Sequence, residues 1–498
     1  MKFTLSTLRG EPMSTSAARS LPEEVAATGP GAHAWRRAFR DLPREHGFEP
    51  LRVEGRLPEG LRGTLYRNGP ALFSTFGRRY GHWFDGDGAL TAVRFDGGGA
   101  AAGAVKLVQS VGLREERRRG RPHYPNYGTP APSLWRGLAA GLTADLKNTA
   151  NTSVMIWQGR LYALLEACRP TELSTEDLST LGERDLDGAV VTTFSAHPHY
   201  VPARRSAYNF GVRYGRRIEL DLFELPDAGR ARRLGTVTLP GATMIHDFIA
   251  TERHLVFFAP PLRLRILRQL VGLGTFGENL RWRPEEGTEV IVVPIDAPTR
   301  VRRFTVPAFY QWHFATAFER GDELVVDYVR FADFASNRWL QQVIDGPARS
   351  TIHGTLHRAV VDAAAGRFTD EERATVGCEF PRVARPAQQN RFVYVAAHSD
   401  EEAARGMFDR VARVDLDRGA VESVALGPGQ YPSEPVFVRR PDGRDEDDGW
   451  LLTLVYDGAS DTSGVAVLDA RDLGRGAIAR AWFDHHLPFT FHGNFAPA

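Results

Sequence analysis

Short apolar runs separated by turn residues recur along nearly the whole chain, and this rhythm constrains the fold more than any other feature of the sequence. Typical runs are V-M-I-W-Q-G-R-L-Y-A-L-L-E, Y-N-F-G-V-R-Y, I-E-L-D-L-F-E-L, E-L-V-V-D-Y-V-R-F and W-L-L-T-L-V-Y. Such runs, spaced about ten residues apart and bounded by turn signals, predict β-strands. Because no helical βαβ rhythm alternates with them, we expect an all-β protein that grows by repetition, a β-propeller rather than a sandwich.

A chain of 498 residues would ordinarily divide into several domains. A propeller avoids this division because it grows by adding similar units, so we expect residues 46–498 to form one β-propeller domain. Residues 1–45 are rich in Ala, Gly, Pro, Ser and charge, which predicts a mostly disordered arm. Within this arm a short helix is expected near residues 34–39.

Two segments interrupt the strand rhythm and predict insertions that cap one face of the propeller. Residues 124–148 have the pattern of an amphipathic helix. In residues 258–282 Leu and Ile alternate with Arg, which fits either a surface that dips into lipid or a long loop folded onto its own barrel. The charge run at residues 114–121 predicts a solvated hairpin end.

The stretch H-W-F-D-G-D-G, which starts at His82, predicts a hairpin because D-G-D-G separates two apolar runs. We expect Asp85 and Asp87 to accept hydrogen bonds from the backbone of their own turn, and His82 to be structural. Neither aspartate is followed by the glutamate that an EF-hand calcium loop requires.

Composition excludes several classes of protein. Lys and Arg number 62 against 61 Asp and Glu, so the net charge of +1 provides no basic field for nucleic acid. Two cysteines, Cys168 and Cys378, are too few for a disulfide framework and indicate a reducing cytoplasm. No apolar run is long enough for a signal peptide or a membrane span, so we expect a cytoplasmic protein whose contact with lipid is peripheral, on the inner membrane surface.

Four histidines interrupt or follow apolar and aromatic segments: His197, His246, His313 and His492. A single histidine in such a setting is usually a hydrogen-bonded core residue. These four are too far apart in sequence for a local zinc site, whose ligands lie only a few residues from one another. They can meet only where separate strands converge on one axis, which predicts a radial fold with a central metal.

Four neutral imidazoles would leave the metal with its full divalent charge. Nitrogen ligands suit Fe, Cu or Zn, and an octahedral ion would keep two positions open. Metal-binding histidines are usually oriented by a carboxylate on the other ring nitrogen. Candidates in apolar contexts are Glu166, Glu379 and Glu434; for any one of them the alternative is a solvent-facing glutamate on an edge strand.

From about Gly55 to the C-terminus the chain resembles the carotenoid cleavage oxygenase family, which includes the retinoid isomerase of vertebrate vision and stilbene-cleaving dioxygenases. The resemblance rests on motifs in the family's order: L-Y-R-N-G-P, H-W-F-D-G-D-G, K-N-T-A-N-T-S-V, L-Y-A-L-L-E, F-S-A-H-P, I-H-D-F, W-H-F-A-T-A-F-E, E-F-P-R, S-E-P-V-F-V and F-H-G-N-F. Motifs in this number and order are specific to the family.

The resemblance implies a seven-bladed β-propeller with one Fe(II) per chain, held on the axis by the four histidines. It implies that the three glutamates bond three of the histidines, leaving His197 without one, and that the methyl of Thr152 lies against an open iron position. The implied reaction is cleavage of a C=C bond of a carotenoid or apocarotenoid by O2, giving aldehyde or ketone products. The substrates would be O2 and an apolar polyene, with no organic cosubstrate.

Departures from the family pattern are informative. Thr316 stands where the family commonly has Asn, and His199 replaces a frequent basic residue; neither is an expected iron ligand. Leu165 occupies the position where stilbene-cleaving members carry a Lys that engages a phenolic hydroxyl, which disfavours a phenolic stilbene. The segments at residues 132–146 and 258–282 are candidates for a substrate entrance near lipid.

Three alternatives remain at this stage: a stilbene-cleaving dioxygenase of the lignostilbene type, a non-cleaving isomerase on the same scaffold, and a catalytically silent propeller that serves as a binding platform. The sequence does not specify the scissile double bond or the oligomeric state.

Overall fold

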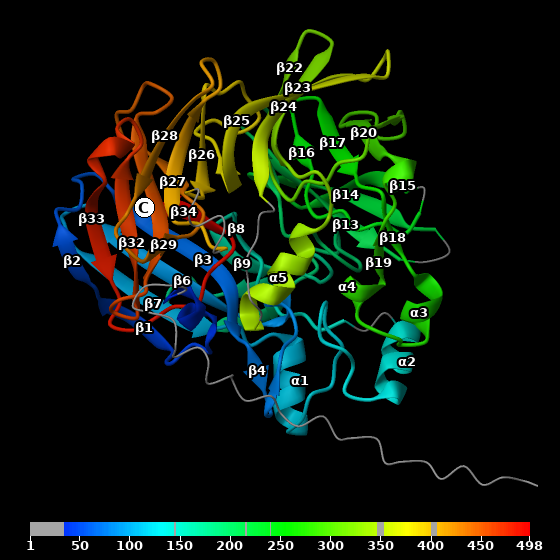
Figure 1. The fold of residues 1–498 in the computed structure, drawn as a ribbon, viewed down its shortest axis with the longest axis horizontal. Helices are drawn as coiled ribbons and strands as arrows, with labels where there is room; N and C mark the ends of the chain where they lie inside the picture. The colour runs from blue at the N-terminus through cyan, green and yellow to red at the C-terminus, as the bar shows by residue number, and fades with distance from the viewer. Residues whose placement is uncertain (1–33, 144–145, 215–216, 240, 346–352, 400–405) are drawn as a thin grey trace, which may run out of the picture.

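The computed structural model describes residues 34–143, 146–214, 217–239, 241–345, 353–399 and 406–498. Figure 1 shows antiparallel β-sheets arranged in a ring, with helices gathered at one side. The sheets make up seven blades, because the seven-stranded sheet forms two blades that share its long middle strand.

The first four blades are separate sheets, and the strands of each follow in order from the axis outward. The first contains β34 (Gly493–Pro497), β3 (Arg62–Leu72), β6 (Asp87–Asp96), β7 (Ala101–Leu107) and β1 (His46–Pro50). The second contains β8 (Ser153–Trp157), β9 (Arg160–Leu164), β10 (Thr171–Leu173) and β11 (Thr180–Glu183). The third contains β12 (His199–Val201), β13 (Ser206–Arg213), β14 (Glu219–Pro226) and β15 (Arg232–Thr238). The fourth contains β16 (Ile249–Ala250), β17 (His254–Ala259), β20 (Thr288–Pro294) and β21 (Arg302–Val306).

The remaining blades follow the same plan. The fifth and sixth form one sheet of β22 (Phe314–Arg320), β23 (Glu323–Arg330), β24 (Gly354–Asp362), β25 (Arg367–Arg382), β26 (Phe392–Ala397), β27 (Arg410–Asp415) and β28 (Ala420–Ala425). The seventh contains β29 (Gln430–Pro432), β30 (Val436–Arg439), β31 (Gly449–Asp457), β32 (Thr462–Asp469), β33 (Ala477–Trp482) and β2 (Arg52–Gly55). The predicted all-β propeller is confirmed.

Both ends of the chain close the ring. The C-terminal strand β34 pairs with β3 of the first blade, from Gly63 opposite Pro497 to Arg67 opposite Gly493. Near the N-terminus, β2 pairs with β33 of the last blade. Opening the ring therefore requires breaking two antiparallel ladders that join distant parts of the sequence.

The core lies between the blades, so central strands are covered on both faces. In β17 every residue from Leu255 to Ala259 is buried, and β31 is buried from Gly449 to Tyr456. This explains why the apolar runs in the sequence are continuous, since a strand with one wet face would alternate apolar and polar residues.

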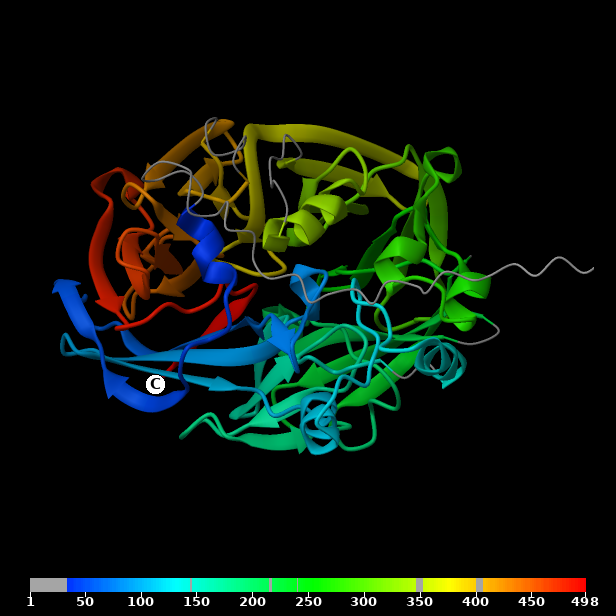
Figure 2. The ribbon, with the colours of Figure 1, turned by 60° about the horizontal axis from the view of Figure 1, so that its bottom comes forward.

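Helices lie on one face of the ring, as Figures 1 and 2 show. The predicted insertion at residues 124–148 contains α2 (Leu134–Thr143), and the one at residues 258–282 contains α3 (Ile266–Leu270) and α4 (Phe276–Asn279). Two further helices, α1 (Val111–Arg119) and α5 (Ser336–Asp345), lie outside the predicted insertions. The segment at residues 258–282 also contains a small hairpin, β18 (Leu262–Leu264) and β19 (Leu280–Trp282). It therefore folds onto the propeller through the hairpin while α3 stays at the surface.

The short helix expected near the N-terminus is present as a 3-10 helix at Ala34–Phe39. Its Trp35, Ala38 and Phe39 are buried against Phe73, Trp83 and Phe489. The packed part of the chain thus begins by residue 34, earlier than the boundary expected at residue 46. The rest of the predicted arm, residues 1–33, lies outside the described residues.

Two predicted hairpins are absent from the described structure. The charge run is not a hairpin end but helix α1, in which buried Glu116 pairs with Lys147 Nζ at 2.8 Å. D-G-D-G is not a hairpin turn either, because Trp83–Asp85 is a 3-10 helix. Buried carboxylates need donors that compensate for lost water, and these came from distant segments.

The two aspartates of this stretch show the effect. Asp85 accepts hydrogen bonds from the Gly128 N–H (3.0 Å) and the Thr129 hydroxyl (2.6 Å), and Asp87 accepts from Lys147 Nζ (2.7 Å). They join the stretch to the insertion instead of bonding their own turn. His82 is buried, and its Nδ1 accepts from the Phe84 N–H at 3.1 Å, as a structural residue would.

Candidate metal centre

Each of the seven blades presents one polar residue near the axis, next to or within its innermost strand. These residues are Thr152 before β8, His197 before β12, His246 before β16, His313 before β22, Glu379 in β25, Glu434 between β29 and β30, and His492 before β34. Equivalent positions in successive blades converge on the axis, which brings together residues that are hundreds of positions apart.

The four histidines form one buried cluster at this point. Ligand atoms of His197, His246 and His313 lie within 4.8 Å of one another. The ring of His492 completes the cluster, with its centroid 4.6 Å from that of His313 and 4.7 Å from that of His197. The structure therefore brings all four sequence-predicted histidines to one centre.

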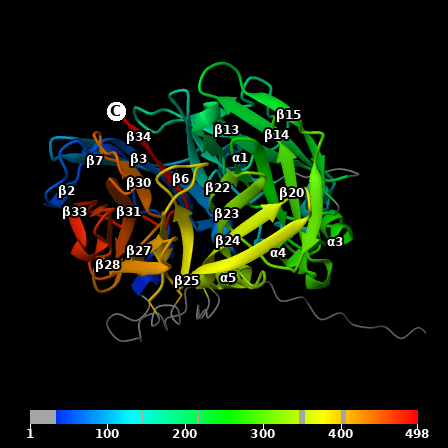
Figure 3. The same ribbon diagram turned by 90° about the horizontal axis from the view of Figure 1, so that it is seen from above.

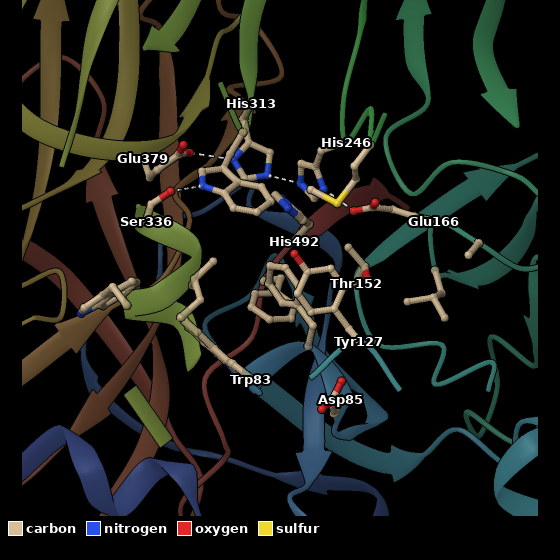
Figure 4. A pocket seen from close by; sticks show the side chains of 18 of the residues that line it. Trp83, Asp85, Tyr127, Thr152, Glu166, His246, His313, Ser336, Glu379 and His492 are labelled. Atoms are coloured by element: carbon tan, nitrogen blue, oxygen red, sulfur yellow. Dashed lines mark hydrogen bonds and ion pairs between the residues drawn. The ribbon is translucent and has the colours of Figure 1, made fainter. Parts of the chain in front are cut away.

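The three predicted glutamates each pair with one histidine through Nδ1. Glu166 contacts His246, Glu379 lies 2.6 Å from His313, and Glu434 lies 2.9 Å from His492. Figure 4 shows the first two pairs at the edge of a pocket. Among the described residues, no carboxylate pairs with His197. This is the arrangement that the resemblance implies. The structure also shows which glutamate pairs with which histidine, which the sequence did not.

The donor set fits a divalent metal. An imidazole that donates from Nδ1 to a carboxylate has only a lone pair at Nε2. The Nε2 atoms of His246 and His313 are 3.2 Å apart, and the buried Nε2 of His197 has no hydrogen-bond partner among the described residues. Burial lowers the pKa of His313 to about 3 and that of His492 to about 4, so these rings are neutral at pH 7. Burial also lowers the pKa of His197, whereas burial at His246 is outweighed by Glu166, which raises the pKa of that ring. Converging imidazole nitrogens suit a transition metal such as iron, and a cation there would occupy their Nε2 lone pairs.

Two arginines that the sequence reasoning missed hold Glu434. Arg67 is fully buried and donates from Nη1 to Glu434 Oε2 at 2.7 Å, while Arg382 Nε donates to Oε1 at 2.9 Å. Although burial raises the pKa of Glu434, Arg382, His492 and Arg67 together hold it well below its usual range. Both arginines could have been found from the sequence, because each stands within an apolar strand motif: Arg67 in L-Y-R-N-G-P and Arg382 in E-F-P-R.

Asp247, also missed, links three histidine segments. It follows His246 directly, its Oδ2 accepts the N–H of Phe314 at 3.0 Å, and its Oδ1 lies 2.8 Å from His199 Nε2. His199, the departure noted in the sequence, thus joins the His197 segment to Asp247. The other departure, Thr316, is buried and donates to the Gln388 carbonyl at 3.2 Å.

Two non-glycine residues with positive φ lie beside the cluster. Phe380, which follows Glu379, has φ of +57°, and its ring stacks on His313 with centroids 5.3 Å apart. Ala150, two residues before Thr152, has φ of +47°. Non-glycine residues adopt this conformation only where the surroundings enforce it, and such positions gather at functional sites.

A largely apolar cavity reaches the cluster from the helical face. Its wall includes many aromatic and aliphatic side chains: Trp83, Phe84, Tyr127, Phe276, Trp312 and Leu340. Thr152, Glu166, His246 and His313 line its inner end, and Leu165 lies in the same wall. Figure 4 shows Thr152 and Tyr127 beside the histidines.

In the described part of the chain, no helix is both long and apolar enough to cross a membrane.

Comparisons with known proteins agree with this geometry. A model of the family described as retinal pigment epithelial membrane protein matches residues 39–497. The chain is 34% identical over 479 residues to apocarotenoid-15,15'-oxygenase of Synechocystis, covering 93% of this chain and 96% of the relative. It is 28% identical to lignostilbene-alpha,beta-dioxygenase isozyme III of Sphingomonas paucimobilis, covering 92% and 96%.

Solved structures give the same result. A cobalt-substituted Synechocystis apocarotenoid oxygenase superimposes with a TM-score of 0.84 at 32% identity, covering 93% of this chain and 98% of that one. The match spans the propeller and its insertions together. The chain therefore belongs to the retinal pigment epithelial membrane protein family, the carotenoid cleavage oxygenases that its motifs resemble.

Proposed function

We propose that the protein is a non-haem Fe(II) dioxygenase that cleaves one C=C bond of a carotenoid or apocarotenoid with O2. The observation that carries this proposal is the set of four converging histidines, three of them bonded to glutamates, at the inner end of an apolar cavity. The name of the Synechocystis relative supports the substrate class. Both oxygen atoms enter the products, so one double bond becomes two carbonyl groups.

His197, His246, His313 and His492 would hold the iron, which when bound supplies the site for binding and activating O2. The glutamates fix the histidine rings and keep their protons on Nδ1. Aromatic walls exclude water and hold an extended polyene. Thr152, in the same wall, would limit access to the open side of the metal.

Leu165 favours a polyene over a phenolic stilbene, although a lignostilbene dioxygenase is among the relatives. It lies in the cavity wall beside Glu166, where an apolar side chain offers neither a charge nor a hydrogen bond to a phenol. An apolar polyene needs no such partner.

Incubation of the Fe(II)-loaded protein in air with a mixture of apocarotenals, carotenes and hydroxystilbenes tests the proposal. We expect mass spectrometry to detect aldehydes derived from a polyene, with about one O2 consumed for each bond cleaved. The masses would also identify the scissile bond. Aldehydes from stilbenes alone would overturn the polyene assignment, and an isomerised substrate without O2 uptake would indicate the isomerase.

The substrate class also accounts for an exposed apolar surface, which we call the α2–α3 patch. It comprises Leu134, Trp135, Ile266, Leu267, Leu270, Val271 and Leu273. Trp135 is 79% and Leu267 is 81% exposed, and α2 and α3 contact each other. Phe276 of the adjoining α4 lines the cavity, so the patch lies near its wall. We propose that this patch dips into a membrane surface from which the polyene enters.

Replacing Trp135 and Leu267 with Glu is expected to reduce co-sedimentation with liposomes by at least about tenfold, because two charges oppose burial in the lipid interface. Iron content should not change, since both side chains are remote from the histidines. Val421→Glu is the matched control, because Val421 is 40% exposed on β28, away from the patch. Equal sedimentation of the double variant and the wild type would contradict this role.

A further inference from the structure

A second cavity touches the histidine cluster. It is lined by side chains of the innermost strands, among them Met155, Trp157, Ala315 and Asn494, and we call it the axial channel. His313 and His492 border both cavities, whereas His197 lines the axial channel. The histidines thus stand between two separate spaces.

The two cavities lie toward opposite ends of the propeller axis, as two strands demonstrate. β8 begins beside Thr152, which lines the apolar cavity, and ends at Trp157, which lines the axial channel. β13 runs the other way, with Ala207 facing the axial channel and Val212 facing the apolar cavity. Figure 3 shows α5 on one face of the ring and the C-terminus on the opposite face.

The cavities differ in chemistry. Exposed Gln158, Tyr200 and Asp227 line the outer part of the axial channel, and Asp247 and Glu434 line its inner part. The wall of the apolar cavity is instead mostly aromatic and aliphatic, although it too includes charged side chains: Asp85, Lys147, Glu166 and Glu379. A hydrated divalent cation can keep hydrogen bonds to polar side chains along the axial channel, whereas it would lose most of them in the apolar cavity.

Arginines also outnumber glutamates around the segment that carries α3 and α4. Arg263, Arg265, Arg268, Arg281 and Arg283 lie there with Glu278, Glu285 and Glu286, and Arg263 and Arg283 pair with Glu286 and Glu285. The excess of positive charge disfavours the approach of a divalent ion from this side.

We propose that the divalent metal reaches the four histidines through the axial channel, and that the apolar cavity serves the organic substrate alone. His197 lines this channel, and within the part of the chain that the structure describes its buried Nε2 has no hydrogen-bond partner, so it is placed to be the first ligand. Metal can then load while the substrate cavity is occupied. This inference rests on the proposed function, since it assumes that the cluster binds a metal.

The test follows the rate of metal uptake by the intact metal-free protein, without turnover. Co(II), or Fe(II) under anaerobic conditions, is added, uptake is stopped with a chelator at set times, and protein-bound metal is measured. Ala207→Lys and Ala207→Glu place opposite charges in the axial channel. Tyr214→Lys and Tyr214→Glu place the same charges in the apolar cavity, which partly exposed Tyr214 lines.

We expect Ala207→Lys to slow uptake and Ala207→Glu to speed it, each by about threefold to tenfold, with unchanged final metal content and little effect of the Tyr214 pair. Equal final content shows that the variants are folded. Rates that follow the charge at position 214, or neither charge, would overturn the route. A wild-type protein that takes up no metal would instead refute the proposed function.

Discussion

His492→Ala is expected to lower bound iron from about one equivalent per chain to less than about a tenth, with complete loss of oxygenase activity. The substitution removes one of four nitrogen donors and leaves the buried Glu434 carboxylate without its imidazole. The measurement is metal content after anaerobic reconstitution with Fe(II) and gel filtration, together with thermal unfolding of the same sample.

His254→Ala provides the control for this experiment. His254 is a half-buried histidine on β17, in the same blade that carries His246, and it lies beside Glu319 and outside the cluster. Iron content should be unchanged in this variant. If His492→Ala also kept its iron, the cluster would not be the metal site, and a propeller that serves only as a binding platform would become the better interpretation.

The fold and the ligands could be predicted because both depend on features that repeat along the sequence. Each blade supplies an apolar run preceded by a turn, and in four blades a histidine stands just before the inner strand, as His246 does before β16. A pattern of this kind is visible locally, even though the residues meet only in three dimensions.

The pairing of glutamates with histidines could not be predicted, because it depends on how loops cross the axis. Glu166 follows β9 in the second blade yet contacts His246 of the fourth, whereas Glu379 and Glu434 reach histidines of the neighbouring blades. Nothing in the local sequence distinguishes a carboxylate that reaches across the ring from one that reaches the next blade.

Local sequence patterns also did not show which charged side chains are buried. Most of the charge run at residues 114–121 is exposed, as predicted, but Glu116 is buried and pairs with Lys147. Asp85 and Asp87 are also buried, and their partners lie in a distant segment that the local sequence does not identify. Arg67, within an apolar strand, was overlooked although a buried arginine requires an anionic partner elsewhere in the chain.

Glu434→Gln is expected to reduce the free energy of unfolding of the metal-free protein by about 3–5 kcal/mol, as for other buried ion pairs that lose one partner. Arg67 is 1% exposed and Glu434 is 2% exposed, so no water replaces the lost carboxylate, and the same carboxylate also bonds Arg382, His492 and the Gly493 N–H. Chemical denaturation of the metal-free variant and wild type measures this loss.

Glu166→Gln is the matched control, because it changes the same group beside a different histidine. The side chain of Glu166 is 27% exposed and pairs with His246, and no described arginine pairs with it, so we expect less than about 1 kcal/mol of destabilisation. Both variants should bind metal about tenfold to hundredfold more weakly, because each loses a carboxylate that orients a histidine.

If the two variants were equally stable, the stability of the protein would not depend on the pairing of Arg67 with Glu434, and the charge network would serve only to orient His492. A large loss confined to Glu434→Gln would show instead that the carboxylate that orients His492 also anchors the closure of the ring, where β3 carries Arg67 and β34 follows His492.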